Sequence, residues 1–349
     1  MIFRQLFDGT SSTYTYLLAD ENAREALLID PVFAQVQRDL ALVDELGLKL
    51  RLVIDTHAHA DHVTAAWLLR AETGCDIASA RAIGAENVTM PLDDGQVCGV
   101  AGVELRCMAT PGHTDGCMSF VTADESRVFT GDTLLIRGCG RSDFQQGSAS
   151  RLYESITGRL FALPESCQVF PAHDYQGRNV SSIGEEKRFN ARVGAGASET
   201  DFVEYMNAMK LPHPKLIDEA LPANMRSGAP EEQGNLPDRP DWGDIHLTYS
   251  GVPEIDEEWL EQHVDRVTVL DVRLAEEVRD CPLAQTLVDV HIPLGELRDR
   301  IAEVPAGQPV VALCRSGRRS SLAVSILRDA GHEQVASLSR GLRAMLQDA

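Results

Sequence analysis

A short polar stretch, Thr56 to His62, carries three histidines and an aspartate directly after the apolar run 50–54. In an extended segment, His57 and His59 project from the same side because side chains alternate along a strand. Neutral imidazole nitrogens and carboxylate oxygens are ligands that suit first-row divalent metals. We therefore predict a metal site where this strand ends.

Three further apolar segments also run into residues that can bind metal. Segment 103–110 leads to His113, segment 127–130 leads to Asp132, and segment 167–170 leads to His173. Four predicted strands are thus each followed by candidate metal ligands. This repetition indicates that the ends of these strands, in one or two sheets, lie close to one point. The candidate metal site then comprises seven side chains: His57, His59, Asp61, His62, His113, Asp132 and His173.

A candidate nucleophile lies near the C-terminus. The apolar segment 309–313 ends at Cys314, and a loop rich in arginine and serine separates it from a helical stretch over 322–330. Loop amides, a helix N-terminus and nearby positive charge all stabilise a thiolate, so we expect a lowered pKa for the Cys314 thiol. Three arginines supply that charge: Arg315, Arg318 and Arg319.

The elements that must position these residues can be predicted from periodicity and from turn residues. The ligand stretch is expected between a strand and a helix, a usual place for a site in a layered α/β protein. Strands are predicted over 13–18, 25–30, 50–54, 103–110, 127–130, 167–170, 267–273 and 309–314. Helices are predicted over 33–46, 62–74 (ended by Gly74), 201–210 and 322–330 (ended by Gly331).

The length of 349 residues exceeds what one hydrophobic core usually serves, so we expect two domains. The stretch 226–251 is rich in proline, glycine and acidic residues, which is typical of a linker. We predict a first domain over 1–225, a linker over 226–251 and a second, smaller α/β domain over 252–349.

Composition narrows the classes of partner. The net charge of −21, from 53 acidic and 32 basic residues, disfavours nucleic acid and anionic membranes. No apolar run is long enough to span a membrane. The N-terminus lacks the pattern of a secretion or transit signal, so we expect a cytoplasmic protein. The eight cysteines are then expected to be mostly buried free thiols. The sequence leaves homo-oligomer formation open.

The pattern Thr-His-Ala-His-Ala-Asp-His over 56–62, followed by separate His, Asp and His residues, resembles the THxHxDH signature of the metallo-β-lactamase superfamily. The resemblance covers about residues 1–225. It implies an αββα sandwich with the metal site at one edge of the two sheets.

Residues 252–349 are similar to the rhodanese family. The similarity rests on Asp271-Val272-Arg273, on Ile292-Pro293-Leu294 and on a CRxGxR loop that starts at Cys314. It implies an α/β domain with a parallel sheet and transfer of sulfane sulfur through a cysteine persulfide. Thiosulfate and glutathione would be the sulfur donor and acceptor, in either direction.

The metal chemistry stays open at the level of the superfamily, which hosts two-zinc hydrolysis, diiron redox chemistry and mononuclear iron oxygenation. His57, His113 and Asp132 form the two-His, one-carboxylate set of a non-haem iron oxygenase. If the remaining candidate ligands also bound metal, the site would be binuclear and suited to hydrolysis.

Segments 138–147 and 171–178 look like those of the persulfide dioxygenase family, which oxidises glutathione persulfide with O2 to sulfite and glutathione. This resemblance implies one Fe(II) per chain, held by His57, His113 and Asp132. The other candidate ligands would then orient groups or handle protons around the iron: His59, Asp61, His62 and His173. Arg141, Tyr175 and Arg178 match positions near the glutathione site of that family.

A binuclear zinc hydroxyacylglutathione hydrolase with an accessory rhodanese module is the alternative. The fusion favours the dioxygenase, because a rhodanese unit makes or consumes the persulfide that such an enzyme oxidises.

Overall fold

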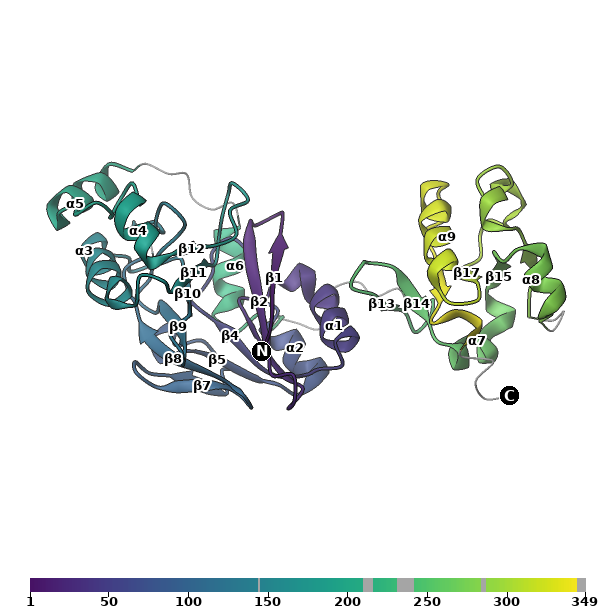
Figure 1. Cartoon of the computed structure of the whole chain (residues 1–349), viewed down its shortest axis with the longest axis horizontal. Helices are drawn as coiled ribbons and strands as arrows, with labels where there is room; N and C mark the ends of the chain where they lie inside the picture. The colour runs from purple at the N-terminus through teal and green to yellow at the C-terminus, as the bar shows by residue number, and fades with distance from the viewer. Residues whose placement is uncertain (144, 210–215, 231–241, 284–286, 344–349) are drawn as a thin grey trace. The chain divides into compact units, whose positions relative to one another are not determined.

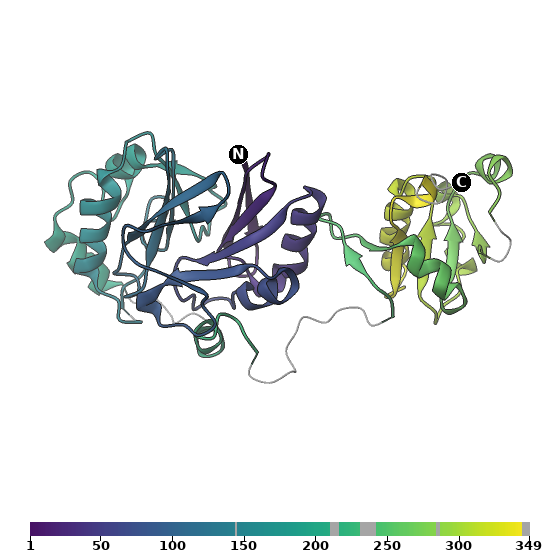
Figure 2. The ribbon, with the colours of Figure 1, turned by 90° about the horizontal axis from the view of Figure 1, so that it is seen from below.

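The computed structural model describes residues 1–143, 145–209, 216–230, 242–283 and 287–343. The chain divides into two compact units, Met1–Leu236 and Pro237–Ala349, whose ribbons are drawn in Figures 1 and 2. Within the described ranges, no helix is both long enough and apolar enough to cross a membrane.

The first unit contains two six-stranded sheets. In the first sheet the strands follow chain order from β1 to β6, with β1, β2 and β3 antiparallel and β3 to β6 parallel. Its strands are β1 (Ile2–Asp8), β2 (Thr13–Ala19), β3 (Glu25–Ile29), β4 (Lys49–Asp55), β5 (Asp76–Ala80) and β6 (Met90–Leu92).

The second sheet has the order β12-β11-β10-β9-β8-β7, and only β10 and β11 are parallel. Because parallel strands end at the same edge, the residues after β10 and β11 emerge side by side. Its strands are β7 (Val97–Val100), β8 (Val103–Ala109), β9 (Met118–Thr122), β10 (Arg127–Gly131), β11 (Gln168–Pro171) and β12 (Ser181–Ser182).

Helices cover the outer faces of both sheets. Figure 1 shows α1 and α2 against the first sheet, and α3, α4 and α5 on the far side of the second. The helices of this unit are α1 (Val36–Glu45), α2 (Ala66–Thr73), α3 (Ala149–Glu154), α4 (Ile183–Phe189), α5 (Glu199–Ala208) and α6 (Ile217–Asn224).

Side chains alternate between the two faces of each strand. They build three apolar layers between the four layers of helices and sheets. In β2, Tyr16 and Leu18 face the second sheet and pack with Phe129, whereas Leu17 and Ala19 face α1 and α2. The outer face of the second sheet packs on α3 and α5 through a third cluster that includes Val128, Leu152 and Phe202. The predicted αββα sandwich is confirmed.

The helix predicted over 62–74 is shorter than expected, since α2 begins at Ala66. The carbonyls that a first helical turn would use are engaged elsewhere: the amide nitrogen of Asn224 binds the His62 oxygen, and the Phe33 amide binds the Val63 oxygen. Gly74 ends the helix in the left-handed conformation, as predicted.

The second unit is a six-stranded sheet of order β13-β14-β18-β17-β15-β16, parallel except for β13 against β14. Helix α9 starts at Arg318, four residues before the predicted start, because Gly317 takes the N-cap position with φ +82°. The elements are β13 (His246–Leu247), β14 (Pro253–Ile255), α7 (Glu257–His263), β15 (Thr268–Asp271), α8 (Ala275–Asp280), β16 (Val290–His291), β17 (Val310–Leu313), α9 (Arg318–Asp329) and β18 (Val335–Leu338).

The stretch predicted as a linker is only partly described, because 231–241 lies outside the described residues. Within the stretch, β13 pairs with β14 of the second unit. The boundaries 1–225 and 252–349 stay a prediction.

Candidate metal centre and sulfur-transfer site

The seven candidate ligands converge at one edge of the sandwich. The loop after β4 supplies four of them, and the loops after β8, β10 and β11 supply His113, Asp132 and His173. Two backbone bonds tie the sheets together at this edge: Tyr14 N–H donates to the Ala172 oxygen at 2.7 Å, and Met118 N–H donates to the Thr56 oxygen at 2.9 Å.

Two glycines allow the loops to approach one another. Gly131 has φ +53°, and a Cβ there would lie 2.7 Å from Thr56 Oγ1. A Cβ on Gly140 would lie 2.4 Å from the Asp132 carbonyl oxygen and 2.9 Å from His113 Nδ1. Any side chain at either position would push a ligand loop away from the site.

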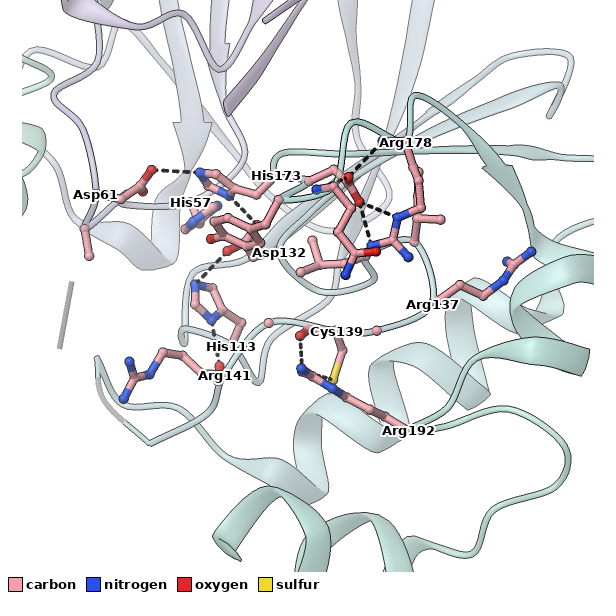
Figure 3. A pocket seen from close by; sticks show the side chains of 18 residues that line it. His57, Asp61, His113, Asp132, Arg137, Cys139, Arg141, His173, Arg178 and Arg192 are labelled. Carbon is pink, nitrogen blue, oxygen red and sulfur yellow. Dashed lines mark hydrogen bonds and ion pairs between the residues drawn. The ribbon is translucent and has the colours of Figure 1, made fainter. Parts of the chain in front are cut away.

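The first group of candidate ligands is His57, His113 and Asp132. Each offers one ligand atom, and these atoms all lie within 4.8 Å of one another. All three residues are buried, and His113 Nε2 lies 3.7 Å from Asp132 Oδ2. Figure 3 shows them gathered on one wall of a pocket.

Hydrogen bonds fix the tautomers of both histidines in this group. His113 Nδ1 lies 2.7 Å from the Arg141 carbonyl oxygen, which can only accept, so Nδ1 carries the proton. Thr56 Oγ1 donates to Asp30 Oδ2 at 2.9 Å and therefore accepts from His57 Nδ1 at 3.0 Å. Both rings thus keep Nε2 as a lone-pair donor, which is what metal binding requires.

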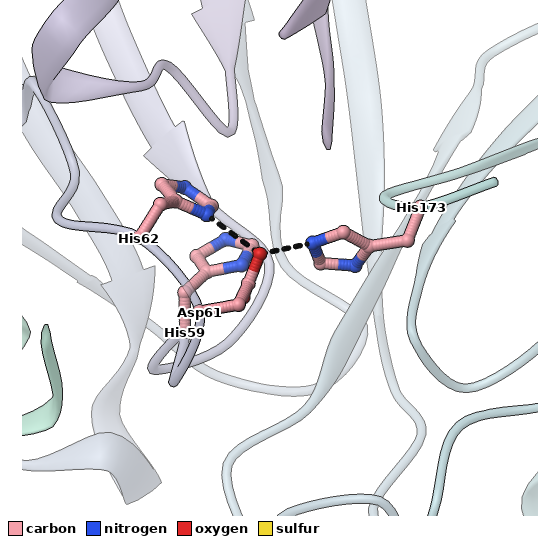
Figure 4. A group of neighbouring side chains, drawn as sticks. All are labelled: His59, Asp61, His62 and His173. Carbon is pink, nitrogen blue, oxygen red and sulfur yellow. Dashed lines mark hydrogen bonds and ion pairs between the residues drawn. The ribbon is translucent and has the colours of Figure 1, made fainter. Parts of the chain in front are cut away.

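The second group comprises His59, Asp61, His62 and His173, whose ligand atoms also lie within 4.8 Å of one another. In Figure 4, His62 and His173 both point at Asp61. His173 Nε2 lies 2.8 Å from Asp61 Oδ2, and its Nδ1 lies 2.7 Å from Asp132 Oδ1. Ionised carboxylates only accept, so both ring nitrogens of His173 are donors here.

The pKa directions agree with this arrangement. Burial lowers the pKa of His57 well below its ordinary value and also lowers that of His113. Burial alone would lower the pKa of His173, but the carboxylates of Asp132 and Asp61 raise it well above its ordinary value. Burial alone would raise the pKa of the Asp132 and Asp61 carboxyls, but charge and hydrogen bonds from the surrounding histidines, His173 foremost, lower the pKa of both.

Two imidazole nitrogens of the second group lack a hydrogen-bond partner among the described residues. They are His59 Nδ1 and His62 Nε2, and both are buried. A buried polar atom without a partner costs free energy, so these positions are suited to a bound ion, a water or a substrate atom.

A pocket of about 330 Å³ opens onto the first group. It contains the three residues predicted from sequence to bind glutathione: Arg141, Tyr175 and Arg178. The Arg141 and Arg178 guanidiniums are held by Asp143 at 2.6 Å and Asp174 at 2.8 Å. Tyr175 is 71% exposed and stacks on the His173 ring, with centroids 6.2 Å apart.

Sequence reasoning missed three residues that organise the site. Asp30 accepts from both the amide and the hydroxyl of Thr56 and lies 3.1 Å from His59 Nε2. The side-chain nitrogen of Asn224 donates to the carbonyl oxygens of His59 and His62 in the loop after β4. Arg192 lines the pocket and donates to the Cys139 carbonyl oxygen at 2.5 Å. Each lies far along the chain from most of what it touches, so no local pattern reveals it.

Cys314 lies at the end of β17 and is 1% exposed. The Ser320 amide and hydroxyl each lie 3.5 Å from its sulfur. Burial alone would raise the pKa of this thiol, but hydrogen bonds from Ser320 and from the amides of Ser316 and Arg319 lower it. The loop therefore has the thiolate-stabilising character expected from sequence. All eight cysteines of the chain are free.

The three arginines of this loop differ in their surroundings. Arg315 and Arg318 are exposed. Arg319 is half-buried and forms a two-pronged ion pair with Glu277. Nearby, Arg273 and Asp271 form a buried ion pair with nitrogen and oxygen 2.7 Å apart.

Comparison with known proteins identifies the family. Residues 8–173 match the family described as metallo-beta-lactamase superfamily, and residues 256–348 match the rhodanese-like domain. Over 229 residues the chain is 48% identical to persulfide dioxygenase ETHE1, mitochondrial, of Bos taurus, which covers 65% of this chain and 89% of that protein. The chain belongs to the metallo-beta-lactamase superfamily.

Two further known proteins are similar to this chain. The crystal structure of ETHE1 from Myxococcus xanthus shares 52% sequence identity with a TM-score of 0.64, covering 66% of this chain and all (100%) of that one. Hydroxyacylglutathione hydrolase of Methylococcus capsulatus is 32% identical over 232 residues, covering 64% of this chain and 86% of that protein. The resemblances to the superfamily and to persulfide dioxygenases are confirmed, as is the C-terminal rhodanese-like domain.

Proposed function

We propose that the first unit oxidises glutathione persulfide with O2 to sulfite and glutathione, using one iron(II). The observation that carries this proposal is the match to persulfide dioxygenase relatives over most of their length, together with a converging His57, His113 and Asp132 set. A general role in sulfur metabolism is supported by the persulfide dioxygenase relatives together with the rhodanese-like domain.

The donor set fits iron. Two imidazoles protonated at Nδ1, each with its lone pair on Nε2, and the carboxylate of Asp132 make the two-His, one-carboxylate set of a non-haem iron site. Iron(II) bound by these residues supplies the redox chemistry through which O2 oxidises the persulfide sulfur. Asp30, through Thr56, and the Arg141 carbonyl hold the two rings in the tautomer that this requires.

The second group would serve the reaction without binding metal. With both His173 nitrogens donating to carboxylates, His173 orients Asp132 and keeps a proton at the wall of the pocket. His59, Asp61 and His62 surround it and complete the hydrogen-bond network. Asp61 and His173 bind each other in this arrangement, at 2.8 Å.

The pocket would bind glutathione persulfide through its carboxylates. Arg141, Tyr175 and Arg178 present two guanidiniums and a phenol ring at its wall, and guanidinium groups bind carboxylates in fork geometry. Asp143 is exposed at 45%, so a substrate carboxylate can replace it on Arg141.

The second unit would transfer sulfane sulfur between thiosulfate and glutathione. The Cys314 thiolate attacks the outer sulfur of thiosulfate, the S–S bond breaks, and sulfite leaves with the bonding pair. A glutathione thiolate then takes the sulfane sulfur, and Cys314 leaves as a thiolate. The reverse sequence consumes glutathione persulfide and sulfite. Arg315, Arg318 and Arg319 supply positive charge for the anionic donor.

A second candidate, a binuclear zinc hydroxyacylglutathione hydrolase, is favoured by the unpartnered nitrogens of His59 and His62 and by the 32% identical relative. Metal content of the purified chain separates the two functions. We expect about one iron per chain for the dioxygenase, whereas about two zincs per chain would support the hydrolase.

A further inference from the structure

Two of the eight cysteines lie against each other between the sheets of the first unit. The sulfurs of Cys98 and Cys107 are 3.7 Å apart and share a hydrogen bond. Both residues are buried, at 6% and 1% exposure, in the apolar layer between the two sheets. Neither lines the pocket beside the first group of candidate ligands, so this thiol pair is separate from the candidate metal centre.

The pair spans a tight hairpin. Strands β7 and β8 are antiparallel, with Cys98 opposite Leu105, and only Ala101 and Gly102 connect them. Gly102 has φ +76°, a conformation that glycine adopts without strain in such a turn. Cys107 lies two positions beyond Leu105 and therefore on the same face of β8. The register of the hairpin thus brings the two sulfurs together.

Strand β7 has room to adjust because it lies at the edge of the second sheet. In the described part of that sheet it pairs with β8 on one side only (Figure 1). The sulfurs of a disulfide are about 2.0 Å apart, so the two sulfurs must approach by about 1.7 Å to bond. An edge strand can make this shift without breaking its pairing to a second neighbour.

A cavity of about 580 Å³ gives a small molecule access to the pair. Cys98 lines this cavity beside Leu52 and Val103, whereas Cys107 is not among the lining residues. A reagent that enters the cavity therefore meets the pair at Cys98. The low exposure of both cysteines favours a small oxidant over a bulky one such as a peptide disulfide.

The contact between the thiols also affects their ionisation. The hydrogen bond from Cys98 lowers the pKa of the Cys107 thiol, although burial would raise it. The same bond and burial raise the pKa of Cys98, so the pair releases one proton and keeps the other. By contrast, burial raises the pKa of Cys117, which contacts Thr114, to about 12. The thiolate is the nucleophile in thiol oxidation.

We propose that Cys98 and Cys107 are a redox pair, which hydrogen peroxide entering through this cavity oxidises to a disulfide that joins β7 to β8. One thiolate sulfur attacks an oxygen of the peroxide, the O–O bond breaks and hydroxide leaves, which gives a sulfenic acid. The second sulfur attacks the first, the S–O bond breaks and a second hydroxide leaves. The two thiols lose two electrons and two protons, and the peroxide becomes two waters.

The test is oxidation of the folded, full-length chain with hydrogen peroxide. A chelator is present, so that bound iron does not react with the peroxide. Remaining thiols are alkylated as the chain is unfolded, and trypsin then cuts after Arg106, between the two cysteines. We expect mass spectrometry to find peptides 82–106 and 107–127 as one linked species, which dithiothreitol separates.

Cys117→Ala is the matched control, because Cys117 is also buried and lies in the same tryptic peptide as Cys107. The linked species should persist in Cys117→Ala and should be lost in both Cys98→Ala and Cys107→Ala. Each of these two variants removes one half of the pair, so either one suffices if the other does not fold.

Three outcomes would overturn the inference. The first is absence of the linked species from the oxidised wild-type chain. The second is its persistence in Cys107→Ala, which would assign the bond to Cys117. The third is oxidation of Cys98 or Cys107 to a sulfinic acid without a link, which would show that peroxide reaches the pair but that the strands do not close.

Discussion

Asn224 is the residue whose loss should most directly loosen the ligand loop. It lies in the last turn of α6 and is buried. Its side-chain nitrogen donates to the His59 and His62 carbonyl oxygens at 2.9 and 2.8 Å, and its side-chain oxygen accepts from the Thr64 amide at 2.8 Å. Asn224→Ala removes all three bonds at once.

The magnitude follows from these three bonds. Each intramolecular hydrogen bond contributes about 1 kcal/mol net, so the variant should lose about 3 kcal/mol of unfolding free energy. His59, His62 and Thr64 are buried, so water reaches their freed backbone groups only in part. Hydration therefore does not compensate for the lost hydrogen bonds. For a domain of this size about 1 kcal/mol corresponds to about 2–4 °C in Tm, so we expect a fall of about 6–12 °C.

The assay is differential scanning calorimetry of the full-length chain, with the transition of the first unit assigned by its response to added iron(II). Asn207→Ala on α5 is the control, because Asn207 is exposed and its replacement should change the free energy by no more than about 0.5 kcal/mol. Metal affinity should fall in Asn224→Ala alone, because the loop that carries His57 is no longer held. A Tm within about 2 °C of wild type would refute the reasoning.

The remaining predictions concern the two reactive sites. Asp132→Ala should lose iron and oxygenase activity together, since it removes a metal ligand and the acceptor of His173; metal analysis that finds full iron occupancy would contradict its proposed role. Cys314→Ser should abolish thiosulfate sulfurtransferase activity and leave O2 uptake with preformed persulfide intact; an unchanged sulfur-transfer rate would reject Cys314 as nucleophile. The sulfur-transfer rate should rise with pH and level off above the lowered pKa of Cys314, and Ser320→Ala should move that rise to higher pH because a hydrogen bond to the thiolate is lost.

Local pattern predicted much of this fold. Strand alternation in β2 and the ligands at the ends of β4, β8, β10 and β11 follow from residue order, and the structure brings them together as expected. The start of α2 could not be predicted, because the His62 and Val63 carbonyls are used by Asn224 and Phe33 and not by the helix. Tertiary contacts override periodicity there.

The roles of charged residues were harder to predict than their presence. Arg315, Arg318 and Arg319 look alike in sequence, but only Arg319 meets Glu277, which is 42 residues earlier in the chain. Asp30 lies 26 residues before Thr56, yet it sets the tautomer of His57. Such pairs depend on which strand ends become neighbours, and a single sequence does not carry that information.

The most direct test of the proposed function is O2 uptake when glutathione persulfide is added to the chain loaded with iron(II) under anaerobic conditions. We expect rapid uptake, with sulfite and glutathione formed as products. Absence of uptake, from protein that retains two zincs and hydrolyses a glutathione thioester, would contradict the dioxygenase and support the hydrolase.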